Sequence, residues 1–281
     1  IPAIPFCAAF AWILGSYLPV TISQYSACFT RSPRRDIIYL RRRKLKRFCA
    51  DRKNMIQECK EEAMTQEERL DFLISYLINE NADYKNIIVP ENPAEKRRLL
   101  RSLMNVRMPA PVSEDFLKAQ DAYLQLESAK KGVTKPRDLT PAEPGIALWQ
   151  GDITTLAADA IVNAANSQML GCFVPCHGCI DNAIHSAAGV QLRLECARVM
   201  SEQGTEEPTG RAKITKAYNL PCRYVLHTVG PIIYREVTRK DCELLASCYR
   251  SCLELAGAYG LKSVAFCCIS TGEFHFPNEL A

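Results

Sequence analysis

From residue 146 onward, short apolar runs rich in β-branched residues alternate with segments of helical periodicity. This alternation restricts the chain to a fold in which helices cover a central sheet. Each expected strand is short and largely apolar, as is typical of a strand buried between helices. The sequence therefore predicts an α/β domain over residues 141–281. The expected strands span 146–150, 160–163, 223–228 and 263–269, and the expected helices span 180–188, 190–201 and 242–259.

A purely helical pattern precedes this domain. Thr65 and Glu68 have the spacing of a capping box, and Asn92 and Ser113 each stand where a helix cap is expected. Leucine and aromatic residues at helical spacing follow each of these starts, and prolines separate the three segments. We expect residues 64–140 to form a helical extension with a structural role.

The first 63 residues do not fit either pattern. The first 30 carry no charge and include three prolines, and a basic run follows between Arg31 and Arg47. A membrane span with a basic cytoplasmic flank is one interpretation, although each proline disturbs helix hydrogen bonding. A targeting segment is another, although the basic residues of a secretory signal come first. The third is that residues 1–63 do not belong to the folded protein.

The distribution of charge argues against a nucleic-acid partner. The whole chain carries +4, and the nine Lys/Arg and one Asp between Arg31 and Arg47 carry +8. Because nothing before Arg31 is charged, the chain after Arg47 carries −4, which is not the basic footprint of a nucleic-acid-binding domain. Most of the 14 cysteines lie in apolar runs, which favours reduced, buried thiols in a cytoplasmic protein. The sequence does not indicate an oligomeric state.

One loop gathers several metal-binding side chains. Cys172, Cys176, His177 and Cys179 lie within nine residues that also contain glycine and proline. Thiolate and imidazole are ligands that zinc prefers, and three protein ligands would leave a fourth position for water or substrate. The spacing matches no common zinc finger, and a cysteine-rich loop with one ordinary histidine is the alternative interpretation.

Further candidates lie at the ends of expected strands. Asp152 could accept from an exocyclic amine, although a turn or helix cap is the commoner use of Asp. The amides of Asn163 and Asn166 can both donate and accept. Asp181 stands at a helix start, where a carboxylate could orient a water or a ribose hydroxyl. Gly272 follows a buried strand and could open a backbone cradle for phosphate, although such turns are common.

In their order and spacing these segments resemble the macrodomain family, and its zinc-containing branch in particular. The resemblance implies a three-layer α/β/α fold with a mixed sheet, with an ADP-ribose cleft at the ends of the strands. The segments that carry the resemblance are ALWQGDIT at 147–154, DAIVNAANS at 159–167, the loop at 172–179, DNAIHSAAG at 181–189, EPTG at 207–210, HTVGP at 227–231 and STGEF at 270–274.

The resemblance also implies a role for each site residue. Asp152 would bind the adenine amine, and Asn166 would hold the distal ribose. The diphosphate would lie between the loop at 189–190 and the loop at 270–274. The implied catalytic residues are Asn166 and Asp181, and the implied Zn²⁺ ligands are Cys172, His177 and Cys179, with Cys176 as a competing thiol. The implied ligand-binding residues are Asp152, Ile153, Asn163, Asn166, Gly189, Val190, Ser270, Thr271, Gly272, Glu273 and Phe274.

These roles imply a zinc-dependent hydrolase that releases ADP-ribose from mono-ADP-ribosylated protein, or that deacylates O-acetyl-ADP-ribose. ADP-ribose and ADP-ribosylated proteins are the expected partners. A non-catalytic module that reads ADP-ribose is the alternative, and a structural zinc domain without a nucleotide ligand is a third possibility. Because family members continue with another helix, strand and helix after the 270–276 loop, we also expect this sequence to be truncated at its C-terminus.

Overall fold

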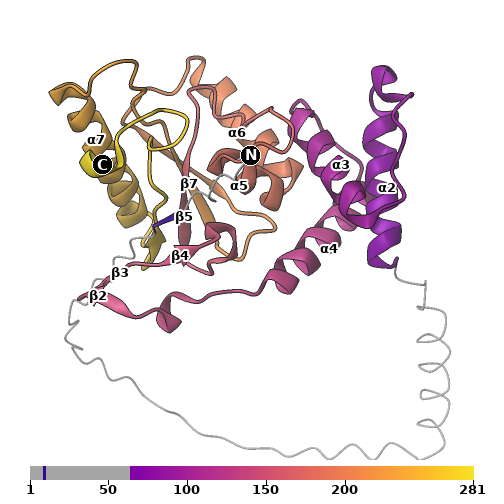
Figure 1. Ribbon diagram of the computed structural model, residues 1–281, viewed down its shortest axis with the longest axis horizontal. Helices are drawn as coiled ribbons and strands as arrows, with labels where there is room; N and C mark the ends of the chain where they lie inside the picture. Colours follow the sequence, from indigo (N-terminus) through magenta and orange to yellow (C-terminus); the bar gives the residue numbers. More distant parts are fainter. Residues whose placement is uncertain (1–8, 11–63) are drawn as a thin grey trace, which may run out of the picture. The chain divides into compact units, whose positions relative to one another are not determined.

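The computed structural model describes residues 9–10 and 64–281. The helical extension consists of α2, α3 and α4, each of which begins directly after the residue predicted to cap it (Figure 1). The Asn92 side chain accepts from the backbone N–H groups of Ala94 and Glu95, and Ser113 Oγ accepts from the N–H of Phe116 at 3.2 Å. The bounds are Gln66–Asn79 for α2, Pro93–Val106 for α3 and Glu114–Lys131 for α4.

The extension has a hydrophobic core of its own. Leu73, Ile74 and Phe116 are fully buried where α2 packs against α3 and α4. Val190 of the α/β domain packs against the same core, and both α3 and α4 contact α5. The extension is therefore packed against the α/β domain through a shared apolar contact.

A series of short elements leads into the main sheet. These are η2 (Pro136–Asp138), β2 (Pro141–Glu143), β3 (Ile146–Ala147), β4 (Gln150–Gly151) and η3 (Ile153–Thr155), whereas η1 (Ala82–Tyr84) lies between α2 and α3. The strand expected at 146–150 is split in two, because β3 pairs antiparallel with β2 whereas β4 pairs antiparallel with β1 (Ala9–Phe10).

The main sheet has four described strands in the order β6-β7-β5-β8. Strands β7 and β8 both pair parallel with β5, and β6 pairs antiparallel with β7, so the sheet is mixed as expected. The expected strand at 263–269 is only two residues long, because its ladder with β5 ends after Ala265. The residues beyond it are still buried, which explains the apolar pattern. The bounds are Ala160–Ala164 for β5, Ala212–Lys216 for β6, Tyr224–Thr228 for β7 and Val264–Ala265 for β8.

Helices cover both faces of this sheet. The pair α5 (Ile180–Ala188) and α6 (Val190–Gln203) lies on one face, and α7 (Arg239–Ala258) lies on the other (Figure 1). One continuous core joins the inner faces of these helices to the strands, and a short η4 (Asn278–Leu280) follows near the end. The structure thus has the predicted α/β architecture with a mixed sheet between two helical layers.

Several cysteines belong to this core. Cys196, Cys222, Cys248 and Cys252 are buried, and burial raises the pKa of each thiol, to about 12 for Cys222. Protonated thiols of this kind pack as small apolar groups.

None of the described helices combines the length and the apolar character that a membrane crossing requires. The apolar and basic segments expected in residues 1–63 lie outside the described residues, apart from the two residues of β1. The domain limits at residues 63 and 140, and the C-terminal truncation, remain predictions.

Candidate functional site

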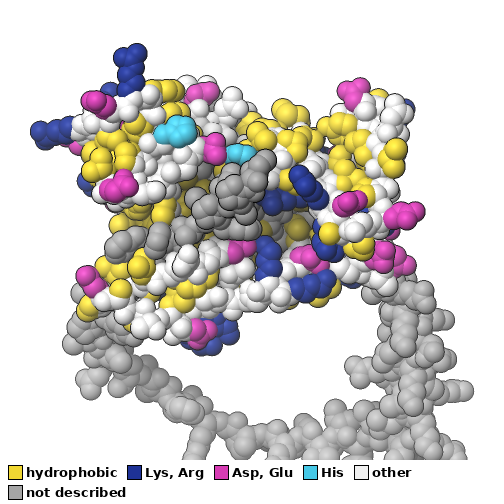
Figure 2. Space-filling model, viewed as in Figure 1, with side chains coloured by type: hydrophobic (Ala, Val, Ile, Leu, Met, Phe, Trp, Pro, Cys, Tyr) yellow, Lys and Arg dark blue, Asp and Glu magenta, His cyan; other side chains and the backbone are white. Residues whose placement is uncertain are grey.

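A cleft of about 1000 Å³ opens between the helical extension and the end of the sheet. One wall comes from α3 and α4, including Arg97, Arg101 and Lys131, and the other from loops that follow β4, β5 and β8. Basic side chains gather between the extension and the α/β domain in Figure 2. The volume is at the upper end of the range for small-molecule sites. The lining combines these basic side chains with the carboxylates of Glu127, Asp152, Asp181 and Glu273.

Three predicted metal ligands converge on this cleft. The ligand atoms of Cys172, His177 and Cys179 all lie within 4.8 Å of one another, and Cys172 Sγ lies 3.6 Å from His177 Nδ1. All three side chains are half-buried. Two sulfurs and one imidazole at this separation fit the donor set and the compactness of a zinc site with an open fourth position.

The Cys176 thiol lies apart from this group. Its Sγ is 3.3 Å from the carbonyl oxygen of Arg98 and 3.2 Å from Ser102 Oγ, both on α3. Cys176 has a positive φ of 52°, which turns its side chain away from the neighbouring His177. The thiol that the sequence left as a competing ligand therefore points toward the extension.

The N-terminus of α5 lies beside Cys172, His177 and Cys179, hereafter the ligand group. Cys179 is the N-cap of α5, and its sulfur accepts from the backbone N–H of Asn182 at 3.4 Å. Burial, together with the neighbouring Cys172, raises the pKa of Cys179 to about 12. The thiol is therefore protonated unless a cation lies beside it, and a bound dication would favour the thiolate.

Glu273 connects the ligand group to the opposite loop. Its Oε1 lies 3.5 Å from His177 Nε2, while His177 Nδ1 faces Cys172. A carboxylate at one ring nitrogen favours a hydrogen on that nitrogen and leaves the other free to bind a metal. Glu273 is thus placed to orient His177, a role distinct from the ligand contact expected from the sequence.

Asp181 lies on the cleft wall two residues after Cys179, and only 5% of its surface is exposed. Its Oδ1 accepts from Asn163 Nδ2 at 2.8 Å and lies 3.5 Å from His185 Nε2. Burial raises the pKa of Asp181 to about 6, although the Asn163 hydrogen bond and Arg193 partly oppose this. Asn163 is fully buried behind Asp181 and does not line the cleft, so it positions the carboxylate from beneath.

Among the residues that line the cleft, two have a buried side-chain atom without a hydrogen-bond partner in the described part of the chain. Asn166 Oδ1 and Ser270 Oγ are both buried and without a hydrogen bond, and both residues line the cleft. The Asn166 amide nitrogen is fixed by the carbonyl oxygen of Gly171 at 3.1 Å. A buried oxygen without a partner is costly, and a ligand hydroxyl could satisfy it.

Asp152 and Ile153 lie at the far end of the cleft. Asp152 Oδ1 accepts from the N–H and the hydroxyl of Thr154, and Asp152 Oδ2 lies 3.0 Å from Lys131 Nζ of the extension. Burial opposes ionisation here, but Thr154 and Lys131 outweigh it and lower the pKa of Asp152. The carboxylate is therefore charged and partly solvent-accessible, with Ile153 buried beside it.

The loop after β8 contributes Ser270, Gly272, Glu273 and Phe274 to the cleft, whereas Thr271 bonds back to the carbonyl oxygen of Cys268 at 3.2 Å. Ser270 has a positive φ of 65°. Its hydroxyl packs so closely on Gly230 that a Cβ there would lie 1.9 Å from Ser270 Oγ. Gly230, which sequence reasoning did not select, is thus required for the path of this loop.

The structure does not bring Gly189 and Val190 to the cleft. Gly189 ends α5, and the N–H of Val190 donates to Gln120 Oε1 of α4 at 3.0 Å. Both residues instead line a cavity of about 10 Å³ between the extension and α6. Residues 178–181, at the N-terminus of α5, line the cleft together with residues of the 270–274 loop.

Sequence reasoning also missed the basic residues of the extension that line the cleft, Arg97, Arg101 and Lys131. Nothing in the periodicity of α3 and α4 distinguishes these positions from an ordinary solvated helix face. Only the packing of the extension against α5 directs them toward the site.

The comparisons with known proteins agree with this architecture. The profile of the family named "Macro domain" matches residues 162–281. The chain is 58% identical over 222 residues to the "Protein-ADP-ribose hydrolase" of Treponema medium, covering 78% of this chain and 85% of that protein. It is 50% identical over 215 residues to the protein of the same name from Staphylococcus aureus strain MSSA476, covering 76% of this chain and 80% of the relative.

Two solved structures are also similar. The Oceanobacillus iheyensis macrodomain with ADP is 43% identical, with a TM-score of 0.41 over 45% of this chain and 65% of that one. The Trypanosoma brucei macrodomain in complex with ADP-ribose is 34% identical, with a TM-score of 0.46 over 67% of this chain and 78% of that one. On the identity and coverage of the sequence relatives, the chain belongs to the macrodomain family.

The buried histidine beneath the site predicts a pH dependence of stability. His227 is fully buried, with Thr215 Oγ1 at 2.9 Å from Nε2 and Asn163 Nδ2 at 3.2 Å from Nδ1, and burial lowers its pKa to about 3. The unfolded chain protonates this histidine below about pH 6.5, whereas the folded protein does not. Stability therefore falls with falling pH between about 6.5 and about 3, by about 1.4 kcal/mol per pH unit from this group.

Guanidinium unfolding at pH 7 and pH 5 would measure this effect. In the parent chain the free energy of unfolding is lower at pH 5 than at pH 7. We expect this decrease to be smaller by about 2 kcal/mol in His227→Gln. The exposed His275, replaced by Asn to suit its positive φ, is the matched control. Equal pH dependence in the parent and in His227→Gln would contradict the account.

Proposed function

We propose that this chain is a zinc-dependent hydrolase that releases ADP-ribose from mono-ADP-ribosylated protein. The observation that carries the proposal is the convergence of Cys172, His177 and Cys179 on a cleft that the buried Asp181 also lines. The names of the two sequence relatives, both "Protein-ADP-ribose hydrolase", support the removal of ADP-ribose. Zinc dependence rests on the donor set of this chain.

The dimensions and polarity of the cleft support ADP-ribose as the ligand. Asp152, charged and partly accessible, is suited to accept from the adenine amine, with the backbone of the buried Ile153 assisting. The N-terminus of α5 and the 270–274 loop both line the cleft, and the backbone N–H groups of either segment could bind the diphosphate. In this assignment residues 178–180, rather than Gly189 and Val190, contact the diphosphate.

The distal ribose would then lie beside the ligand group. Asn166 Oδ1 can accept from a ribose hydroxyl, because its amide nitrogen is already held by Gly171. The Asp181 carboxylate orients or deprotonates the attacking water, since Asn163 fixes one of its oxygens from behind. When bound, the dication would supply Lewis acidity next to the distal ribose.

The reaction class follows from these roles. Water adds across the bond that joins the anomeric carbon of the distal ribose to the modified side chain, so ADP-ribose and the unmodified protein are released. Deacylation of O-acetyl-ADP-ribose uses the same ligand and the same water, and it is the variant of the proposal for a small-molecule substrate.

Removing one of the proposed zinc ligands tests whether hydrolysis depends on zinc. We expect Cys172→Ala to lose bound zinc and hydrolysis of ADP-ribosylated protein together, because two remaining ligands hold zinc weakly. Cys242→Ala is the matched control, since this exposed thiol on α7 lies outside the ligand group, and it should retain both. Zinc content is measured by elemental analysis, and hydrolysis with and without a chelator. A Cys172→Ala variant that hydrolyses at the parent rate would refute zinc dependence.

Replacing the carboxylate separates an enzyme from a non-catalytic reader. An amide at position 181 can still accept from Asn163, so we expect Asp181→Asn to keep its zinc and its affinity for ADP-ribose. Its turnover should fall by about 10²–10⁴-fold, the usual contribution of a general acid or base. Calorimetric titration with ADP-ribose and a turnover assay measure the two properties. If the parent chain binds ADP-ribose without turnover, it is a reader module instead.

A further inference from the structure

The loop that carries the ligand group, residues 171–179, has no helix or strand of its own and is held by side chains from outside it. Arg101 of α3 donates through Nη2 to the carbonyl oxygen of His177 at 2.9 Å. The same guanidinium donates to Asn182 Oδ1 from Nη2 at 2.7 Å and from Nε at 3.2 Å. Asn182 in turn donates to the carbonyl oxygen of Val174 at 2.9 Å. Arg101 thus reaches the loop directly and through Asn182.

Other contacts come from the same face of α3. The backbone N–H of Cys176 donates to Asn105 Oδ1 at 2.9 Å, and Cys176 Sγ contacts Ser102 Oγ and the carbonyl oxygen of Arg98. The four α3 positions in contact with the loop, 98, 101, 102 and 105, have the i, i+3, i+4, i+7 spacing of a single helix face. One face of α3 therefore contacts the loop at Cys176 and His177.

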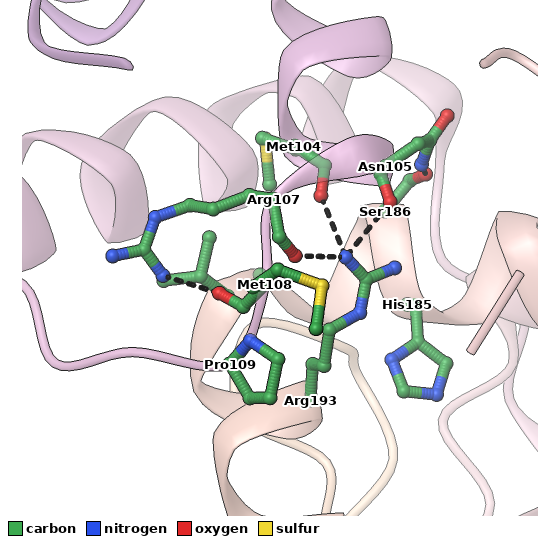
Figure 3. A pocket seen from close by; sticks show the side chains of 10 residues that line it. Met104, Asn105, Arg107, Met108, Pro109, His185, Ser186 and Arg193 are labelled. Carbon is green, nitrogen blue, oxygen red and sulfur yellow. Dashed lines mark hydrogen bonds between the residues drawn. The ribbon is translucent and has the colours of Figure 1, made fainter. Parts of the chain in front are cut away.

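Arg193 of α6 fixes the end of α3 against the same loop. Only 5% of Arg193 is exposed, and its Nη1 donates to the carbonyl oxygens of Met104 at 3.1 Å and Asn105 at 2.8 Å, and to that of Arg107 (Figure 3). Its Nε donates to the carbonyl oxygen of Leu170 at 2.6 Å, directly before the loop. Carbonyl groups at a helix C-terminus lack helical partners, and a cation satisfies them well.

We propose that α3 of the helical extension increases the metal affinity of the site, and that Arg101 is the residue of α3 that positions the loop carrying the ligand group. The inference rests on the proposed zinc site. Arg101 does not touch the metal; it restrains the backbone of His177 and, through Asn182, the turn that carries Cys172. Because an irregular loop loses conformational entropy when its ligands converge, restraint in advance increases metal affinity. The extension would then control how tightly the catalytic domain holds its metal.

The test measures zinc affinity of the whole chain by competition with a chromophoric chelator, a property that does not depend on catalysis. We expect Arg101→Ala to bind zinc about 10–100-fold more weakly than the parent, as is typical when an outer partner of a metal ligand is removed. Arg198→Ala is the matched control, because Arg198 is an exposed arginine paired with Glu202 on α6. The control should bind zinc as the parent does.

The absorption spectrum of bound Co²⁺ shows whether Arg101→Ala still binds the metal through the same ligands. With saturating Co²⁺ in place of zinc, Arg101→Ala should keep the thiolate-to-metal absorption of the parent, since the same three ligands are present. If Arg101→Ala does not fold, Arg101→Gln, which can replace only one of the donor contacts, is judged by the same zinc affinity. Parent-like affinity in the folded variant overturns the inference. A parent chain that takes up no zinc instead overturns the proposed function, so the two failures are distinct.

Discussion

Two guanidinium groups donate to backbone carbonyl oxygens in and around the loop on which two sulfurs and an imidazole converge. Arg193 is buried, and burying a cation is expensive unless every donor finds a partner. Its partners are carbonyl groups at the end of α3 and at the start of the metal-ligand loop, and these gain charge-assisted hydrogen bonds in return. Arg101 likewise donates to a backbone carbonyl oxygen of the loop, that of His177. The loop thus has a defined shape without regular secondary structure.

This constraint explains why the extension and the α/β domain form one site. The cleft has a wall from each, and Lys131 of α4 pairs with Asp152 at one end while α3 holds the ligand loop at the other. Beneath the cleft, Asp181 rests on Asn163, and Asn163 in turn contacts the neutral His227. Because this polar network is buried, it fixes the carboxylate rather than leaving it free to move.

Local signals in the sequence were sufficient for much of this structure. Helix caps at Asn92 and Ser113 fixed where α3 and α4 begin, because capping needs only neighbouring residues. The loop from Cys172 to Cys179 was recognisable as a candidate metal site because thiol and imidazole groups lie close together in the chain. The choice of Cys172, His177 and Cys179 came from the family resemblance, and their ligand atoms do lie together. Strand β6 was not predicted, although its alternating Ala212-Lys213-Ile214-Thr215-Lys216 pattern is a strand signal.

Contacts between distant segments could not be predicted in this way. Arg101 and Arg193 act on backbone carbonyls, and a carbonyl carries no side-chain signature in a sequence. The family resemblance implied that Gly189 and Val190 bind the diphosphate, but the corner between α5 and α6 packs against Gln120 of the extension. The 263–269 run was apolar because it is buried, not because it is paired along its length.

X-ray absorption at the zinc edge, on the chain loaded with one equivalent of zinc, tests the central claim most directly. The account predicts two sulfur ligands at about 2.3 Å and two nitrogen or oxygen ligands at about 2.0–2.1 Å. Addition of ADP-ribose should alter only the lighter ligands and leave both sulfurs in place. A spectrum without sulfur, or with three or four sulfurs that ADP-ribose leaves unchanged, would contradict an open zinc site at the cleft.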